Sequence, residues 1–106
     1  ARTPRIGGFG IDMPAKTVGP FNVESTSWTA YRVRGYCRKI IVCEVNQAGT
    51  VDYYVSSSGT DTDQRARPAG KEYIFESERT LSPGGVPFYL KTAAGSVNFD
   101  AEEQLN

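Results

Sequence analysis

Apolar and polar side chains alternate along most of this chain in short runs that are separated by glycine-containing turns. The runs are Trp28 to Gly35, Arg38 to Val45, Thr50 to Ser57, Lys71 to Ser77, Pro87 to Ala93 and Ser96 to Ala101. Within the second run, Ile41, Cys43 and Val45 share one face while Glu44 takes the other. A period of two is typical of a half-buried strand, and no stretch carries a helical stripe. The pattern therefore predicts an all-β fold.

The runs recur at a spacing of roughly ten residues, which suits antiparallel neighbours in a sandwich or a small barrel. We predict an antiparallel β-sandwich, jelly-roll-like, with the small barrel as the alternative. The clearest local feature is a hairpin that joins Arg38 to Val45 with Thr50 to Ser57 through a short loop ending in Gly49. Val51, Tyr53 and Val55 form the apolar face of its second strand.

A closing hairpin is predicted between Pro87 to Ala93 and Ser96 to Ala101, and it should bury its own aromatic and aliphatic side chains. The side chains expected to pack there are Phe88, Leu90, Val97 and Phe99. Trp28, the single tryptophan, opens a strand and is expected in the core. Residues 56–70 offer almost nothing to bury and should form the longest exposed loop, and residues 102–106 should form a polar tail.

Three prolines and four glycines fall within residues 1–20, a density that opposes regular strand pairing. We expect an extended N-terminal arm over residues 1–20 and a single β-sandwich domain over residues 21–106. The arm also carries apolar side chains, namely Ile6, Phe9, Ile11 and Met13. These side chains must be buried either against the arm's own domain or against a neighbouring molecule, and the sequence leaves both outcomes open.

The 106 residues include 12 basic and 12 acidic side chains, so the formal net charge is zero. Nothing in this balance favours nucleic acid as a partner. Residues 1–53 carry seven positive and four negative side chains, and residues 54–106 carry five positive and eight negative. Copies could pair through this gradient, but an uneven split by chance is the preferred explanation. The sequence has no apolar run of about 18 residues and no charged-then-apolar leader, so we expect no membrane association and no secretion, with removal of a processed leader before Ala1 as the alternative.

Cys37 and Cys43 are the two cysteines. On one continuous strand they would face the same side about 20 Å apart at ~3.3 Å per residue, too far for a disulfide, which needs Cα atoms within ~7 Å. We therefore expect both thiols to be reduced unless Arg38 and Lys39 form a turn, with Cys43 as a small core residue. Reduced cysteines are consistent with synthesis in the cytosol.

Histidine is absent from the sequence, which removes the commonest general base and zinc ligand together with any Ser-His-Asp or Cys-His arrangement. Two cysteines at this spacing do not make a zinc site. Asp61 and Asp63 resemble the start of a calcium loop, but Arg65 and Arg67 follow directly and would repel the ion, so a solvated loop is preferred. We expect no enzymatic activity, no metal and no cofactor.

Two surface patterns remain as candidate binding features. We interpret a basic stripe over Arg32, Arg34, Arg38 and Lys39 as ordinary polar surface, in preference to a contact with a partner. Exposed aromatic rings could form a flat platform for carbohydrate, with Trp28, Tyr53, Tyr54 and Tyr89 as its candidates. Of these rings, Tyr54 is the best candidate for exposure because it lies on the face of Asp52 and Ser56.

Three segments carry a resemblance to known proteins: CRKIIVCEVNQAGTVDYYVSSS, ARPAGKEYIF and PFYLKTAAGSVNFDAEE. Their order resembles that of small β-sandwich virion structural proteins of tailed bacteriophages, of the capsid decoration or cement type. The resemblance implies a virion structural protein that is assembled in the host cytoplasm and is oligomeric on the particle. Its partner would be the major capsid protein or another virion protein, with no nucleic acid and no membrane.

On this reading the protein caps and stabilises the head shell, and a tail, neck or baseplate component is the alternative within the same class. A carbohydrate-binding module is the alternative of a different class. The contacts to the shell or to sister subunits are expected from the arm and from the loop near residue 65. The predicted interface residues are Arg2, Arg5, Ile6, Phe9, Ile11, Arg65 and Arg67.

Overall fold

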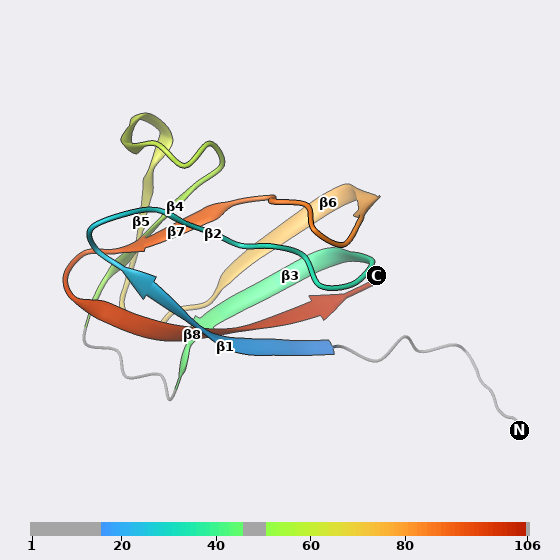
Figure 1. The fold of residues 1–106 in the computed structure, drawn as a ribbon, viewed down its shortest axis with the longest axis horizontal. Coiled ribbons are helices and arrows are strands. Elements are labelled where there is room, and N and C mark those ends of the chain that lie inside the picture. Colours follow the sequence, from blue (N-terminus) through green and yellow to red (C-terminus); the bar gives the residue numbers. More distant parts are fainter. Residues whose placement is uncertain (1–15, 46–50, 106) are drawn as a thin grey trace, which may run out of the picture.

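The computed structural model describes residues 16–45 and 51–105, and these residues form two packed antiparallel sheets (Figure 1). The strands are β1 Lys16–Glu24, β2 Thr29–Ala30, β3 Cys37–Glu44, β4 Tyr53–Ser56, β5 Arg65–Arg67, β6 Tyr73–Leu81, β7 Tyr89–Thr92 and β8 Ser96–Gln104. A short 3-10 turn covers Asp61–Asp63 between β4 and β5. The predicted all-β class is confirmed.

The strand order is β1-β8-β3-β6 in the first sheet and β2-β7-β4-β5 in the second. Eight strands wound alternately into two four-stranded sheets in this order make a jelly roll. The two sheets remain separate, so the sandwich is formed and not the small barrel. β6 and β5 are edge strands on one side of the sandwich, and β1 and β2 are edge strands on the other.

The core fills the space between the inner faces of the two sheets. Buried aliphatic and aromatic side chains from both sheets meet there, among them Val23, Ile40, Val42, Tyr53, Phe88, Leu90 and Phe99. Phe99 on β8 lies at the centre: its ring is 5.1 Å from that of Tyr53 in an edge-on arrangement and 6.1 Å from that of Phe21. Each such side chain contributes roughly 1.5–3 kcal/mol through its removal from water. The core thus joins the sheets through strands that are distant in sequence.

The hairpin predicted between residues 38–45 and 50–57 does not form. β3 pairs with β6 and β8 in the first sheet, whereas β4 pairs with β5 and β7 in the second. The connection therefore crosses from one sheet to the other, which lets the apolar faces of both strands point into the same core. The predicted turn over residues 46–49 lies outside the described residues.

The predicted closing hairpin is wrong for the same reason, since β7 and β8 belong to different sheets. The turn between them is held by the Thr92 hydroxyl, which donates to the Gly95 carbonyl at 2.8 Å, and by the Ala93 amide, which donates to Asp52 at 2.9 Å. The expected burial of Phe88, Leu90 and Phe99 in one cluster is confirmed. They meet across the sandwich and not across a hairpin.

Strand β3 presents to the core the face opposite to the predicted one. Ile40, Val42 and Glu44 point inward and are buried, while Cys43 is half-buried on the outer face. Cys37 is buried despite its even spacing from Cys43, so the alternation of β3 reverses between residues 37 and 40, in the stretch where the β3–β6 register is irregular. Both cysteines are free, as predicted.

Strand β1 begins at Lys16, so the expectation that residues 16–20 avoid strand pairing is wrong. They pair with β8 from Lys16 opposite Glu103 to Val18 opposite Ala101. The register then shifts between Val18 and Phe21, where Gly19 has a φ of +149° and precedes a cis peptide bond to Pro20. A Cβ at Gly19 would lie 2.5 Å from Asp100 Oδ1, so this close approach requires glycine. The glycine and the proline are absorbed in an irregularity instead of ending the strand.

Trp28 is not a core residue: it is half-buried outside the sandwich. The inward positions of its segment are Tyr31 and Val33, which are buried, while Arg32 and Arg34 between them are exposed. The predicted alternation of this segment is therefore confirmed in its period, but the opposite set of side chains points inward. Only two residues of the predicted strand over 28–35 pair as β2. The Tyr31 and Val33 amides then donate to the Phe88 and Gly85 carbonyls at 3.1 and 2.9 Å before the segment crosses to β3 in the first sheet.

Candidate protein-interaction surfaces

The predicted interface residues fall into two groups. Arg2, Arg5, Ile6, Phe9 and Ile11 lie outside the described residues. Arg65 and Arg67 lie on β5, the short edge strand of the second sheet, where they pair with Val55 and Tyr53 of β4. The segment predicted to be a plain exposed loop therefore contains a strand that presents both arginines at one edge of the sandwich.

The loop that delivers β5 is built around Ser56, which is buried at the end of β4. Its hydroxyl oxygen accepts the backbone N–H of Gly59 at 2.9 Å and donates to the carboxylate of Asp63. Ser57 donates a second hydrogen bond to Asp63 at 2.8 Å, and the bonds from Ser56 and Ser57 lower the pKa of this carboxyl to about 2. These bonds fold residues 57–63 into a compact turn. The polarity of the segment thus reflects an internal network as well as solvent exposure.

A cleft of about 380 Å³ opens between the edge strands β5 and β6. Arg65, Arg67 and Asp63 line it together with Tyr73 of β6. The guanidinium of Arg67 spans the cleft: Nη2 donates to the Glu72 carbonyl at 2.7 Å, and the guanidinium carbon lies 5.9 Å from the centroid of the Tyr73 ring. Arg65 is exposed at the rim. Two cations and one carboxylate give the cleft a net positive charge that suits an acidic group of a partner.

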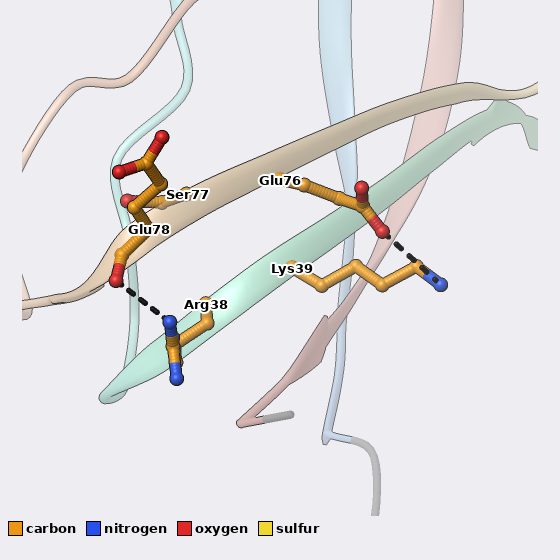
Figure 2. A pocket seen from close by; sticks show the side chains of 5 residues that line it. All are labelled: Arg38, Lys39, Glu76, Ser77 and Glu78. Carbon is orange, nitrogen blue, oxygen red and sulfur yellow. Dashed lines mark hydrogen bonds and ion pairs between the residues drawn. The ribbon is translucent and has the colours of Figure 1, made fainter.

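A second polar cleft, of about 540 Å³, lies across β3 and β6 (Figure 2). Figure 2 shows Lys39 reaching Glu76, with a nitrogen-to-oxygen distance of 3.8 Å, and Arg38 donating to the backbone carbonyl of Glu78 at 2.6 Å. The register explains this arrangement, because residues 77–80 of β6 lie opposite Arg38 alone. A bulge of this size disrupts the outer edge of β6 and opposes the addition of a further strand.

Of the four aromatic side chains predicted as a carbohydrate platform, Trp28, Tyr54 and Tyr89 are half-buried. Tyr53 is fully buried in the core and cannot take part. Trp28 donates its indole N–H to Asp61 Oδ1 at 3.0 Å, and its ring is covered by Lys91, whose Nζ lies 4.9 Å from the ring centroid. Gly59 packs so closely on Tyr89 that a Cβ there would lie 3.1 Å from the ring. These rings therefore pack against the protein's own loop and lysine.

The two aspartates of the calcium-like segment are committed to protein groups. Asp61 binds Lys91, with 3.0 Å between Nζ and Oδ1, and the hydrogen bonds from Lys91 and Trp28 lower its pKa. Asp63 faces Ser56 and Ser57. Within residues 16–45 and 51–105, no three His, Cys, Asp or Glu side chains are grouped so that they could hold a metal ion.

Glu103 is a buried carboxylate, although the sequence predicts a polar tail over residues 102–106. Strand β8 continues to Gln104, and Glu103 points inward. It accepts hydrogen bonds from the Tyr31 hydroxyl, from the Arg34 amide at 2.9 Å and from the Gly35 amide at 3.0 Å. Burial and the bond to Glu103 raise the pKa of Tyr31. The signal that was missed is the continued alternation from Phe99 through Ala101 to Glu103.

An apolar groove of about 260 Å³ lies on the opposite side of the sandwich from the arginine-lined cleft, between edge strands β1 and β2. Its lining is formed by Val18 and Phe21 of β1, Thr29 and Ala30 of β2, and Tyr31, Arg32 and Arg34 of the segment that Glu103 holds. Phe21 and Ala30 are partly exposed, and the two arginines are exposed at the rim. This groove was not predicted, because its walls come from strands that do not pair.

Comparison with known proteins gives no relative. No protein-family model matches the chain, and neither a curated protein nor a solved structure matches it. The described part of the chain contains no helix with the length and hydropathy that a membrane span requires.

Proposed function

We propose that this protein is a virion structural protein of a tailed bacteriophage, a capsid decoration protein that binds and stabilises the head shell. The observation that carries the proposal is the jelly-roll strand order, since this architecture is used by viral capsid domains and by lectins. A fold alone does not define a function. The proposal therefore also relies on the resemblance of residues 37–103 to phage sandwich proteins.

The arginine-lined cleft is the surface through which we propose that the protein contacts the shell. Arg65 is exposed, and it has no ion-pair partner within 4.0 Å among the described residues. Arg67 is held in place by Glu72 and Tyr73, so it presents its charge at a defined position. A fixed cation beside an exposed one suits carboxylate groups on a receiving protein.

The test is sedimentation of the purified protein with empty shells assembled from the major capsid protein of the same phage. We expect saturable binding, and we expect Arg65→Glu to weaken it at least tenfold. Arg79→Glu is the matched control, because Arg79 is an exposed arginine outside the cleft. Binding that is unaffected by Arg65→Glu would contradict the role of the cleft.

The same assay with isolated tails and necks separates the head from the other virion locations. A protein that sediments with tails and not with shells would be a tail, neck or baseplate component. Binding to no virion part, combined with specific capture on a glycan panel that Tyr54→Ala abolishes, would replace the proposal with a carbohydrate-binding module.

A further inference from the structure

The apolar groove between β1 and β2 is large enough to accommodate a few side chains. Its volume of about 260 Å³ lies below the roughly 300–1,000 Å³ typical of small-molecule sites. Val18 and Tyr31 are nearly inaccessible, and Phe21 and Ala30 leave part of their apolar surface uncovered. Such a groove suits one or two apolar side chains of a polypeptide.

The segment before β1 carries side chains of this kind. Residues 1–15 include Ile6, Phe9, Ile11 and Met13. This segment joins the fold at Lys16, which pairs with Glu103 near the end of β8. Fifteen residues can span up to about 50 Å when extended, which is enough to reach across a neighbouring domain of this size.

The direction of β1 favours a neighbour as the receiver. From Lys16 the strand runs along the groove past Val18 and Phe21, so the groove lies ahead of the point where the segment attaches. To reach its own groove, the segment would have to reverse its direction before Lys16, whereas it can enter the groove of a neighbouring copy without a reversal.

We propose that the apolar side chains of residues 5–13 of one copy dock in the β1–β2 groove of a second copy, and that the exchange is reciprocal. A reciprocal exchange closes as a two-fold dimer and leaves neither groove empty. The contact is made by side chains and not by strand addition, because Pro20 and the shifted register interrupt the outer edge of β1. The inference rests on the proposed function in one respect: it supplies the self-association expected of a decoration protein.

Disulfide trapping between two differently tagged copies tests the exchange. In a Cys43→Ser background, one copy carries Phe9→Cys and the other carries Ala30→Cys; Cys37 is kept because it is buried. Mild oxidation of the mixture is expected to give a covalent dimer that contains one copy of each. Ala94→Cys replaces Ala30→Cys as the matched control, because Ala94 is an exposed alanine in the β7–β8 turn, away from the groove.

Arg32→Cys at the groove rim provides a second trap in case Ala30→Cys perturbs the packing of β2, and the melting temperature of each variant shows whether it is folded. Equal trapping of Ala30→Cys and Ala94→Cys would overturn the proposal. So would a disulfide that forms within one chain carrying both Phe9→Cys and Ala30→Cys while mixed copies form none, because the segment would then dock on its own domain.

Shell binding by the same variants separates the two proposals. Folded variants that bind shells but yield no mixed disulfide would overturn the exchange and leave the decoration function standing. Mixed disulfides in a protein that binds no virion part would support the exchange and overturn the decoration function.

Discussion

Tyr31→Phe is a stringent test of how Glu103 holds the crossing segment. The change removes the hydroxyl that donates to the buried carboxylate and leaves the ring in place. The Phe ring keeps the stacked contact with Phe88, at 5.2 Å between centroids, and the contact with Phe21 at 5.7 Å. The loss of stability therefore reports the hydrogen bond and not the packing.

A hydrogen bond to a charged group contributes about 1.5–3 kcal/mol to stability. We expect Tyr31→Phe to lower the free energy of unfolding by about this amount, because the Arg34 and Gly35 amides still satisfy the carboxylate. At about 4 °C for each kcal/mol in a domain of this size, the melting temperature should fall by roughly 6–12 °C. Glu103→Gln should cost more, since its amide nitrogen would face a donor.

The assay is urea unfolding at pH 7 followed by circular dichroism, with calorimetry for the melting temperature. Tyr36→Phe is the matched control, because Tyr36 is 68% exposed, and it should change the free energy of unfolding by less than about 0.5 kcal/mol. If Tyr31→Phe costs no more than this control, the bond to Glu103 does not hold the segment. The double variant Tyr31→Phe/Glu103→Gln should lose less than the sum of the single variants, because both remove the same bond.

Three further predictions address the core, the β4–β5 loop and the thiols. Phe99→Ala should lower the free energy of unfolding by about 3–5 kcal/mol in urea titrations, and a loss below about 1 kcal/mol would contradict its central position. Asp63, whose ordinary pKa is 3.8, should titrate near pH 2 by NMR. Because the pKa is lowered on folding, its stabilising effect is complete above about pH 4 and is lost as the pH falls toward 2; Ser57→Ala should raise this pKa, and a value of 3.8 in the unmodified protein would refute the network. Alkylation of the native protein should reach half-buried Cys43 before buried Cys37, with Cys37→Ser and Cys43→Ser variants to assign the two rates, and the reverse order would contradict the burial of Cys37.

The sequence was informative about where strands lie and uninformative about which strands pair. Alternation over residues 38–45 and 50–57 placed β3 and β4 correctly, because a period of two is a local property. Their partners are set by the closure of the core across two sheets, which no local pattern records. The phase of β3 was also ambiguous, since both its faces carry apolar residues. Its inward Glu44 is stabilised by the Gly70 amide at 2.8 Å, a contact between segments 26 residues apart.

For the candidate surfaces too, the sequence indicated local properties and not which strands lie side by side. The sequence placed Arg65 and Arg67 in an exposed loop; they lie on β5, where Arg65 is exposed and Arg67 is half-buried. It could not show that they line a cleft with Tyr73, because this requires β5 and β6 to be neighbouring edges of different sheets. Of the predicted aromatic platform, Tyr53 points into the core, and the rings of Trp28 and Tyr89 are partly covered by Lys91 and Gly59, contacts that composition does not encode.

The central place of β8 in the first sheet has a consequence for how the chain folds. β8 pairs with β1 on one side and with β3 on the other, so it bridges two strands that are synthesised long before it. Among the described strands, β4 and β5 are the one consecutive pair that are also neighbours in a sheet. Folding must therefore close large loops before most pairings form, a topology associated with slow kinetics. During translation, β1 and β3 lack their shared neighbour until β8 emerges from the ribosome. Their unpaired edges are therefore available for contact with chaperones until that point.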